Sequence, residues 1–194
     1  AYWASKADGQ NIRAWYTSSG NETVDLSDQT KGLAYVVTAQ KTANFNTEVS
    51  LTFSHALAKV RVELTGETAS FVDNVSIKGY TTCALSQGTW SNGANVGEIK
   101  MYKVADKVFE ANVYPGYQIK EVKANNGAWS QLSTAVTPEA AKIYKMGIGV
   151  TSKTITLSDQ TEEVCTVESG KSIIINGGGN SLNKRIVIQD NAKV

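Results

Sequence analysis

Short strand-like runs separated by polar turns recur along almost the whole chain. The dipeptide Asn-Gly, which tolerates the two positive φ angles of a tight hairpin turn, occurs at Asn92-Gly93, Asn126-Gly127 and Asn176-Gly177. Val, Ile and Thr together contribute 50 of the 194 residues, an excess that favours strands over helices. This pattern predicts an all-β chain, most simply an antiparallel β-sandwich.

Thirteen short runs carry the pattern. The predicted strands are Ile12–Thr17, Leu33–Thr38, Glu48–Phe53, Ala56–Leu64, Phe71–Lys78, Glu98–Val104, Val108–Tyr114, Ile119–Val122, Ile143–Val150, Thr154–Leu157, Glu163–Val167, Ser172–Ile175 and Arg185–Gln189. A single short helical patch is predicted at Pro138–Lys142, with Thr137 as its N-cap and Pro138 at the first helical position.

The stretch from Val49 to Leu64 contains a change of phase. Its apolar side chains occupy odd positions up to Leu57 and even positions from Ala58 onwards. Strand side chains alternate between the two faces of a sheet, so one regular strand cannot present both sets to the same core. We therefore predict a bulge, a bend or two separate strands at Leu57–Ala58.

Charge and hydropathy exclude several classes of protein. With 19 Lys and Arg against 18 Asp and Glu, the chain lacks the positive surface that nucleic-acid binding requires. No stretch approaches the ~20 apolar residues of a transmembrane helix, and the opening residues Ala1-Tyr2-Trp3 are unlike a signal peptide. We expect no nucleic-acid partner and no transmembrane segment, in a chain that is a mature product or a fragment.

Catalytic and cofactor motifs are weak throughout the chain. His55 is the single histidine, and we interpret it as a half-buried strand residue because no nucleophile motif surrounds it. Gly170-Lys171-Ser172 lacks the earlier glycine and the following helix of a phosphate-binding loop. Glu162 and Glu163 are adjacent and would point to opposite faces of a strand, which is unsuited to paired-carboxylate hydrolysis. The sequence predicts a non-enzymatic protein without a cofactor.

Metal and disulfide chemistry are also limited. Asp25, Asp28 and Asp73 do not have the spacing of a calcium-binding loop, so we expect no metal site. Cys83 and Cys165 can form at most one bridge and cannot build a four-thiolate zinc site. The sequence leaves open whether these two cysteines pair.

Two tryptophans lie beside Asn-Gly dipeptides. Trp90 precedes Asn92-Gly93 by two residues, and Trp129 follows Asn126-Gly127 by two. An exposed indole at such a turn is a candidate for stacking on a sugar ring or on a partner surface. The alternative is that each indole packs across its own hairpin as a cross-strand partner, and this second interpretation is favoured.

An ordered set of segments resembles one known family. The segment Val49–Val60 contains the pattern F-x-H-A-L-x-K-V, and it is preceded in order by Tyr2-Trp3, Ile12–Tyr16, Asp28–Thr30 and Leu33–Ala39. Together they resemble the fimbrillin-like family, the major and minor fimbrial subunits of outer-membrane bacteria of the gut and mouth. The segments similar to the family's second domain are Ile99–Val104, Ala111–Pro115 and Ile143–Val150. The resemblance covers about residues 1–157.

The resemblance implies two transthyretin-like β-sandwich domains in tandem. Residues 1–66 would be the remainder of the first sandwich, and residues 67–157 would be the second. It further implies export as a lipoprotein, a location at the outer membrane and cell surface, and assembly of a fimbrium or pilus by strand exchange. The expected partners are neighbouring fimbrial subunits or ligands on host or microbial surfaces, including glycans. Strand exchange is β-augmentation and needs no catalytic residue.

Residues 158–194 form a third predicted region, with a soft boundary near residue 152. Its candidate donor strand consists of Arg185, Ile186, Val187, Ile188 and Gln189, with Ile186 and Ile188 entering pockets of a neighbouring subunit. Alternatively, residues 163–194 resemble successive coils of a right-handed parallel β-solenoid of the carbohydrate-binding kind, and the sandwiches then serve as a spacer for a glycan-binding module. Two coils are too few to be stable alone, so we expect an interior piece of a longer exported chain.

Overall fold

The computed structural model describes residues 9–66, 68–125 and 127–150 with their side chains, and the backbone of four further strands beyond residue 150. Within these residues the regular structure is almost entirely β, and the only helix is the one-turn 3-10 helix η1 (Ala69–Phe71). The prediction of an all-β fold is confirmed. Strand pairs within residues 9–150 are antiparallel except one, the parallel pair at residues 58–65 and 143–149.

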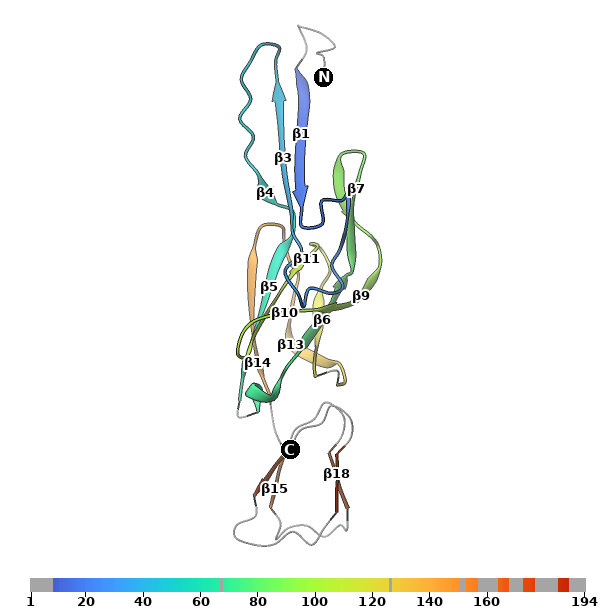
Figure 1. Cartoon of the computed structure of the whole chain (residues 1–194), viewed down its shortest axis with the longest axis vertical. Helices are drawn as coiled ribbons and strands as arrows, with labels where there is room; N and C mark the ends of the chain where they lie inside the picture. Colours follow the sequence, from blue (N-terminus) through green and yellow to red (C-terminus); the bar gives the residue numbers. More distant parts are fainter. Residues whose placement is uncertain are drawn as a thin grey trace.

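Eighteen strands follow one another along the described part of the chain (Figure 1). They are β1 (Gln10–Thr17), β2 (Thr23–Asp25), β3 (Val36–Ala43), β4 (Ser54–His55), β5 (Ala58–Thr65), β6 (Val75–Tyr80), β7 (Thr82–Ser86), β8 (Thr89–Asn92), β9 (Val96–Lys100), β10 (Tyr102–Ala105), β11 (Val108–Val113), β12 (Ile119–Ala124), β13 (Ser130–Val136), β14 (Ile143–Gly149), β15 (Lys153–Thr156), β16 (Val164–Val167), β17 (Ile173–Asn176) and β18 (Arg185–Ile188).

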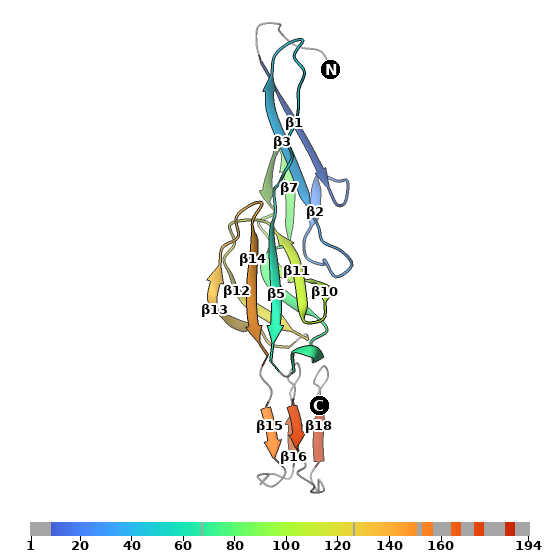
Figure 2. The ribbon, with the colours of Figure 1, turned by 90° about the vertical axis from the view of Figure 1, so that its left-hand side faces the viewer.

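Two four-stranded sheets form what we call the main sandwich. One sheet has the order β10-β11-β5-β14 and the other β13-β12-β6-β9, and the two lie face to face (Figure 2). Strand β5 shows why they pack. Its even-numbered side chains, from Ala58 to Leu64, are buried, whereas Lys59, Arg61 and Glu63 between them face outward. This period-2 pattern gives the sheet one apolar and one charged face.

The interior of the main sandwich is apolar and closely packed. Its buried side chains are Ala58, Val60, Val62, Leu64, Ala69, Val72, Val75, Ile77, Ile99, Met101, Phe109, Ala111, Val113, Ile119, Val122 and Met146. On the outer face, Glu110 is paired with Lys59 at 3.0 Å and with Arg61 at 3.3 Å. Both faces of this sheet are therefore occupied, one by the core and the other by paired charges.

A second, smaller assembly extends from one end of the main sandwich. It consists of the sheet β1-β3-β4, which we call the upper sheet, and the sheet β2-β7-β8, which we call the side sheet. Figure 1 shows the upper sheet projecting beyond the sandwich as a long ribbon. The small core at its base contains Val24, Leu26, Ala34, Val36, Leu57 and Cys83.

Gln29 connects this smaller assembly to the main sandwich. Its side chain is buried and accepts hydrogen bonds from the backbone N–H groups of Ala34 (3.0 Å) and Asn112 (3.1 Å). Its amide donates to the backbone carbonyls of Leu26 (3.2 Å) and Asn112 (2.8 Å). Each polar atom of this buried amide is thus satisfied, and the loop between β2 and β3 is fixed against β11.

The predicted change of phase at Leu57–Ala58 is a boundary between two strands. β4 ends at His55 and pairs with β3, whereas β5 begins at Ala58 and pairs with β11 and β14. The strand prediction at Glu48–Phe53 is wrong, because the pairing with β3 begins only at Ser54 and His55. The odd-numbered apolar residues before His55 therefore lie along an irregular segment.

Two further expectations about turns are corrected. The segment Pro138–Lys142 is a turn without a helix, and Ala141 has a φ of 59°, which ends any helical continuation. Asn92-Gly93 does not close a hairpin. The tight turn between β7 and β8 is Gln87-Gly88, whose φ values of 50° and 74° are the positive pair that such turns require.

The predicted turn at Asn126-Gly127 does lie between the paired strands β12 and β13, although residue 126 itself is outside the described residues. Besides the two-residue β4, four strands were not predicted at all. They are β2, β7, β8 and β13.

Beyond residue 150 the four strands pair in parallel. β15 pairs with β17, with Lys153 opposite Ile173, and β16 pairs with β18, with Val164 opposite Arg185. The two offsets are 20 and 21 residues, so each strand of one repeat pairs with the corresponding strand of the next. Parallel pairing at a fixed offset is typical of successive coils of a β-solenoid.

Candidate functional site

The upper sheet has one face that no described strand covers. In its register Ile12, Ala14 and Tyr16 of β1 lie opposite Lys41, Ala39 and Val37 of β3, and His55 of β4 lies beside Val37. Opposite residues of an antiparallel pair share a face. We call this surface the open face, and it consists of Ile12, Ala14, Tyr16, Val37, Ala39, Lys41 and His55, of which Ala39 is buried.

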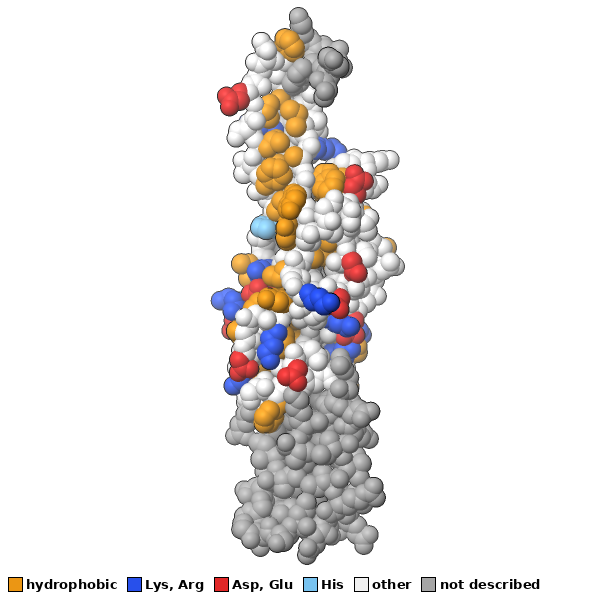
Figure 3. Space-filling model, in the orientation of Figure 1, with side chains coloured by type: hydrophobic (Ala, Val, Ile, Leu, Met, Phe, Trp, Pro, Cys, Tyr) orange, Lys and Arg blue, Asp and Glu red, His pale blue; other side chains and the backbone are white. Residues whose placement is uncertain are grey.

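Apolar side chains are unusually exposed on and around the open face. Tyr16 is 58% exposed, and Phe53, directly before β4, is 47% exposed. The ring of Tyr16 lies 5.9 Å from that of Tyr35. Figure 3 shows hydrophobic side chains in a nearly continuous column along this part of the molecule. Contiguous exposed apolar surface of this kind marks interaction sites in soluble proteins.

Strand β1 also has an unpaired edge. It is the outermost strand of the upper sheet, and its one partner in the described part of the chain is β3, over all eight residues from Gln10 to Thr17. The backbone N–H and C=O groups of such an edge are a template for another strand. The open face and the free edge of β1 together have the geometry needed for β-augmentation.

The opposite face of the upper sheet forms the floor of a cleft with a volume of about 630 Å³. The floor consists of two cross-strand pairs, Arg13 with Gln40 and Trp15 with Thr38. The β7–β8 hairpin forms one wall through Leu85, Thr89 and Trp90. The remaining lining residues include Thr52, Ser54, Tyr114, Pro115 and Ala140.

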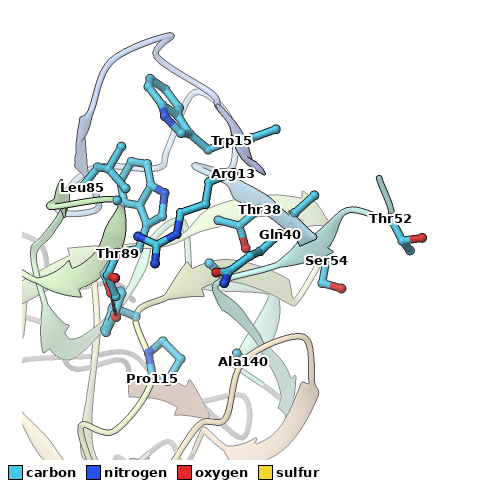
Figure 4. A pocket seen from close by; sticks show the side chains of 16 residues that line it. Arg13, Trp15, Thr38, Gln40, Thr52, Ser54, Leu85, Thr89, Pro115 and Ala140 are labelled. Atoms are coloured by element: carbon cyan, nitrogen blue, oxygen red, sulfur yellow. Dashed lines mark hydrogen bonds between the residues drawn. The ribbon is translucent and has the colours of Figure 1, made fainter. Parts of the chain in front are cut away.

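Within the described part of the chain, Arg13 is the one charged side chain that lines the cleft. Its Nη1 donates a hydrogen bond to the backbone carbonyl of Gln87 at 3.1 Å, which holds the guanidinium against the hairpin turn. A Cβ atom at Gly88 would clash with that nitrogen, so a larger residue at this position would displace the guanidinium. Figure 4 shows the guanidinium directed across the cleft, between Thr89 on one side and Gln40 on the other.

Trp90, one of the two predicted ligand-stacking residues, lies in the wall of this cleft. Its ring is 5.9 Å from that of Trp15 with an interplanar angle of 75°, and its carbonyl accepts a hydrogen bond from the Tyr114 hydroxyl at 2.8 Å. Its indole N–H is buried and has no hydrogen-bond partner among the described residues. Trp90 thus packs within the fold and lines a cavity at the same time.

Trp129, the other predicted stacking residue, lies far from the cleft, over the outer face of the β13-β12-β6-β9 sheet. The ammonium groups of Lys78 and Lys123 are 4.8 Å and 5.1 Å from its ring centroid. These lysines pair in turn with Glu121 and Glu98, each at 2.6 Å. The indole is already engaged in cation–π contacts across neighbouring strands.

The candidate donor strand is present as β18, which pairs in parallel with β16. Its residues Arg185, Ile186, Val187 and Ile188 lie opposite Val164, Cys165, Thr166 and Val167, in that order. Gln189, the last residue of the predicted donor, lies outside the described residues. In the single chain the donor segment, with Val187 in its middle, therefore has a partner strand of its own, which strand exchange would have to replace.

The remaining candidates for chemistry are dispersed. His55 is exposed on the open face, not half-buried as expected. Asp25 and Asp28 accept hydrogen bonds from the backbone N–H groups of Ser27 (2.8 Å) and Thr30 (3.0 Å) in their own turns. Among the residues that the structure describes, no three His, Cys, Asp or Glu side chains are placed to hold a metal ion. Glu162, Glu163 and Gly170-Lys171-Ser172 lie outside the described residues.

Several groups have shifted pKa values. Burial in the small core raises the pKa of the Cys83 thiol to about 11, and this cysteine is unpaired. Burial also raises the pKa of the nearby Tyr114 hydroxyl. For Glu98, burial acts to raise the pKa, but hydrogen bonds from Lys123 and Ser76 outweigh it, and the pKa lies below its usual value. Burial and ordinary ion pairing account for these three shifts, which give no indication of a catalytic group.

The described residues include no helix of the length and hydropathy needed to cross a membrane.

The three sets of predicted site residues lie apart in the fold. Trp90 lies in the cleft beside the β7–β8 hairpin, and Trp129 lies beneath the ammonium groups of two lysines. Arg185–Ile188 forms strand β18, which pairs with β16.

The sequence matches the family model described as fimbrillin-like over residues 1–169. The chain belongs to the fimbrillin-like family. A search of curated protein sequences found no match. This membership supports a fimbrial or adhesive role at the cell surface.

Solved structures similar to this fimbrillin-like chain come from Bacteroides. A proposed cell adhesion protein from Bacteroides uniformis has a TM-score of 0.53 and 20% identity, over 73% of this chain and 68% of that one. A second from Bacteroides ovatus has a TM-score of 0.46 and 12% identity, over 72% and 62%. A fimbrial protein from Bacteroides ovatus has a TM-score of 0.31 and 11% identity, over 59% and 25%. The first of these shares the fold, and the chain spans about two thirds of the two adhesion-protein structures.

Proposed function

We propose that this fimbrillin-like chain is a non-enzymatic cell-surface adhesin or fimbrial subunit that assembles by β-strand exchange. The observation that carries the proposal is the upper sheet. Among the described residues it combines an apolar face that no other strand covers with an edge strand, β1, that is paired on one side only. A strand from a neighbouring subunit would add main-chain hydrogen bonds along β1 and place alternate apolar side chains over the open face. Export as a lipoprotein and anchoring at the outer membrane belong to the same proposal.

Arg185–Gln189 is the proposed donor. Ile186 and Ile188 are spaced two residues apart, so in an extended strand they point to the same side and can enter neighbouring positions on an open sheet, while Val187 between them points away. To act as a donor, the segment would exchange its pairing with β16 for pairing with β1 of the next subunit. The energetic gain comes from the apolar surface around Tyr16 that is solvent-exposed in the single chain.

Light scattering coupled to size-exclusion chromatography tests this assembly. Oligomers are expected for the full chain and are lost when residues 180–194 are deleted, because the donor is removed. Tyr16→Lys is expected to weaken the same oligomers, since a charge is introduced into the acceptor face. Ile143→Lys is the matched control, because Ile143 is 66% exposed on the main sandwich and away from the upper sheet.

Two outcomes contradict strand exchange at β1. One is a full chain that stays monomeric at 200 µM. The other is a loss of oligomers with Ile143→Lys but not with Tyr16→Lys, which would move the interface to the edge strand β14.

A second candidate function, saccharide binding, is favoured by the cleft beside the β7–β8 hairpin. Aromatic walls with a few polar groups are typical of small-ligand sites, and the lining of this cleft includes Trp15 and Trp90 together with several hydroxyl groups. Glycan-array binding by the chain is expected to be lost with Thr89→Phe, which fills the cleft from its exposed side. Trp129→Ala is the control, and loss of binding with this variant but not with Thr89→Phe would place the ligand elsewhere.

A further inference from the structure

The polar groups of the cleft are almost entirely unused by the protein itself. Four hydroxyl groups and one amide line it, on Thr38, Thr52, Ser54, Thr89 and Gln40. Within the part of the chain that the structure describes, none of these side chains makes a hydrogen bond to another residue. They form a set of free donors and acceptors around one cavity.

The charge of the cleft is equally uncompensated. Among the residues that the structure describes, none forms an ion pair with Arg13 and no acidic side chain lines the cavity. One of its five N–H donors is used, by the backbone of Gln87. The other four N–H donors have no hydrogen-bond partner among the described residues, and the guanidinium lies between Thr89 and Gln40 (Figure 4). A planar guanidinium held in this way matches a carboxylate, with which it forms paired, charge-assisted hydrogen bonds.

We propose that the cleft binds a saccharide that carries a carboxylate group. The sugar carboxylate bonds to Arg13, its hydroxyl groups exchange hydrogen bonds with Gln40 and Thr89, and an apolar face of a ring packs on the Trp15–Trp90 wall. This inference rests on the saccharide-binding candidate above and adds to it the ligand class and the residue that selects it.

The geometry favours a saccharide over a peptide strand. The floor of the cleft is the face of a sheet, so it presents the side chains of Arg13, Trp15, Thr38 and Gln40, and the backbone groups that β1 and β3 turn toward each other are already bonded. A strand docking there would find no free main-chain groups to pair with. A nucleic acid is disfavoured as well, because a single cation neutralises too few phosphates.

Calorimetric titration of the full chain tests the proposal with acidic and neutral probes. The acidic probes are 3′-sialyllactose and trigalacturonate, and the neutral ones are lactose and the trigalacturonate methyl ester. We expect dissociation constants in the millimolar range or below for at least one acidic probe. We also expect at least tenfold weaker binding of its neutral counterpart, because the paired contact to Arg13 is lost.

Matched charge variants identify the site. Arg13→Gln is expected to remove the preference for the acidic probe, whereas Lys41→Gln, which removes the same charge from the opposite face of the same strand pair, keeps it. Circular dichroism melts establish that both variants are folded. If Arg13→Gln destabilises the chain, the Gln40→Ala variant serves instead, with at least threefold weaker binding expected.

The contrary results separate the two levels of the proposal. If no probe binds at 10 mM, both the saccharide function and this inference are wrong. If neutral and acidic probes bind equally, or if Arg13→Gln keeps the acidic preference, the saccharide function stands and the carboxylate inference is overturned. Equal binding of a tri-glutamate peptide would overturn the choice of a saccharide.

Discussion

The main sandwich and the upper sheet are built from similar strands but differ in how many layers cover them. In the main sandwich, strands such as β5 turn one face to a closed apolar core and the other to paired charges. In the upper sheet, β1 and β3 are covered on the cleft side by the β7–β8 hairpin, and the open face carries a 58% exposed Tyr16. A closed pair of layers provides stability, whereas a single layer leaves apolar surface available for a partner.

The two faces of the upper sheet differ in the interactions that they can make. Its free edge and open face provide backbone pairing and apolar contact, which are the requirements of assembly. Its other face, with Arg13 and Trp15, provides a charged and aromatic cavity, which is the requirement of ligand binding. One thin sheet therefore presents two different surfaces on opposite faces, which the thick sandwich cannot do because its inner faces are filled.

The largest expected effect lies in the closed core. Phe109 is fully buried between the two sheets of the main sandwich, so Phe109→Ala is expected to lower the free energy of unfolding by about 3–5 kcal/mol through lost burial and a residual cavity. Urea unfolding monitored by circular dichroism measures it. The control Phe71→Ala, at a position 40% exposed, is expected to cost less than about 1 kcal/mol. Equal losses for the two variants would mean that the sandwich core is not the stabilising unit.

A somewhat smaller effect is expected at the connection between the two regions. Gln29→Leu keeps the volume of the side chain but leaves the N–H groups of Ala34 and Asn112 and the carbonyl of Asn112 without partners. Leaving buried polar groups unsatisfied is expected to cost about 2–4 kcal/mol. Urea unfolding measures the loss, with the exposed Gln131→Leu as control. A neutral result for Gln29→Leu would mean that the β2–β3 loop is not fixed by this amide.

The sequence predicted the regular parts of this comparison well. Alternation along Ala58–Leu64 and the change of phase at Leu57–Ala58 identified β5 and the boundary before it, because both depend on the period of a strand alone. The segment Glu48–Phe53 alternates just as clearly, yet it forms no strand because a strand also needs a paired neighbour. The alternation of apolar and polar residues shows which side chains a segment could bury as a strand. Whether the segment pairs with another strand depends on the rest of the chain.

The site was harder to predict, for a physical reason. Trp90 was recognised as a candidate from its place beside Asn92-Gly93, but the hairpin turn is at Gln87-Gly88, and the cleft depends on that turn meeting Arg13. The contact joins residues 74 positions apart. Gly88 gives a local signal, because its position has a positive φ and a side chain there would disturb the contact. The residues around Gly88 do not indicate that its partner is Arg13.

The pH dependence of stability probes the small core between the two regions. The thiol of Cys83 ionises near its ordinary pKa of 9.0 in the unfolded chain and near a pKa of about 11 in the folded one. Between these values only the unfolded state loses the proton. The free energy of unfolding is therefore expected to fall by up to about 2–3 kcal/mol as the pH rises from 9 to 11, and to be unaffected by this group below pH 9.

Cys83→Ala lacks this ionisation and serves as the reference. Urea unfolding of both chains at pH 7, 9 and 10.5 gives the difference between them, in which other titrating groups cancel. Wild type is expected to lose stability relative to Cys83→Ala only at the highest pH. Parallel behaviour of the two chains would mean that water reaches the thiol, and that the small core is more open than the core of the main sandwich.

The smallest effect on the single chain, and the most direct test of the comparison, is expected on the open face. Phe53, which adjoins the open face, is 47% exposed, so Phe53→Ser is expected to change the free energy of unfolding by less than about 1 kcal/mol at 1 µM protein, a concentration at which association is expected to be negligible. At 200 µM the full chain is expected to gain stability through association, because binding to a partner stabilises the folded state by mass action. The Phe53→Ser variant is expected to gain less, because it presents less apolar surface to the partner. Urea unfolding at both concentrations measures the two effects. A loss of several kcal/mol at 1 µM would mean that the open face is already covered within one chain, and the contrast between a closed sandwich and an open sheet would fail.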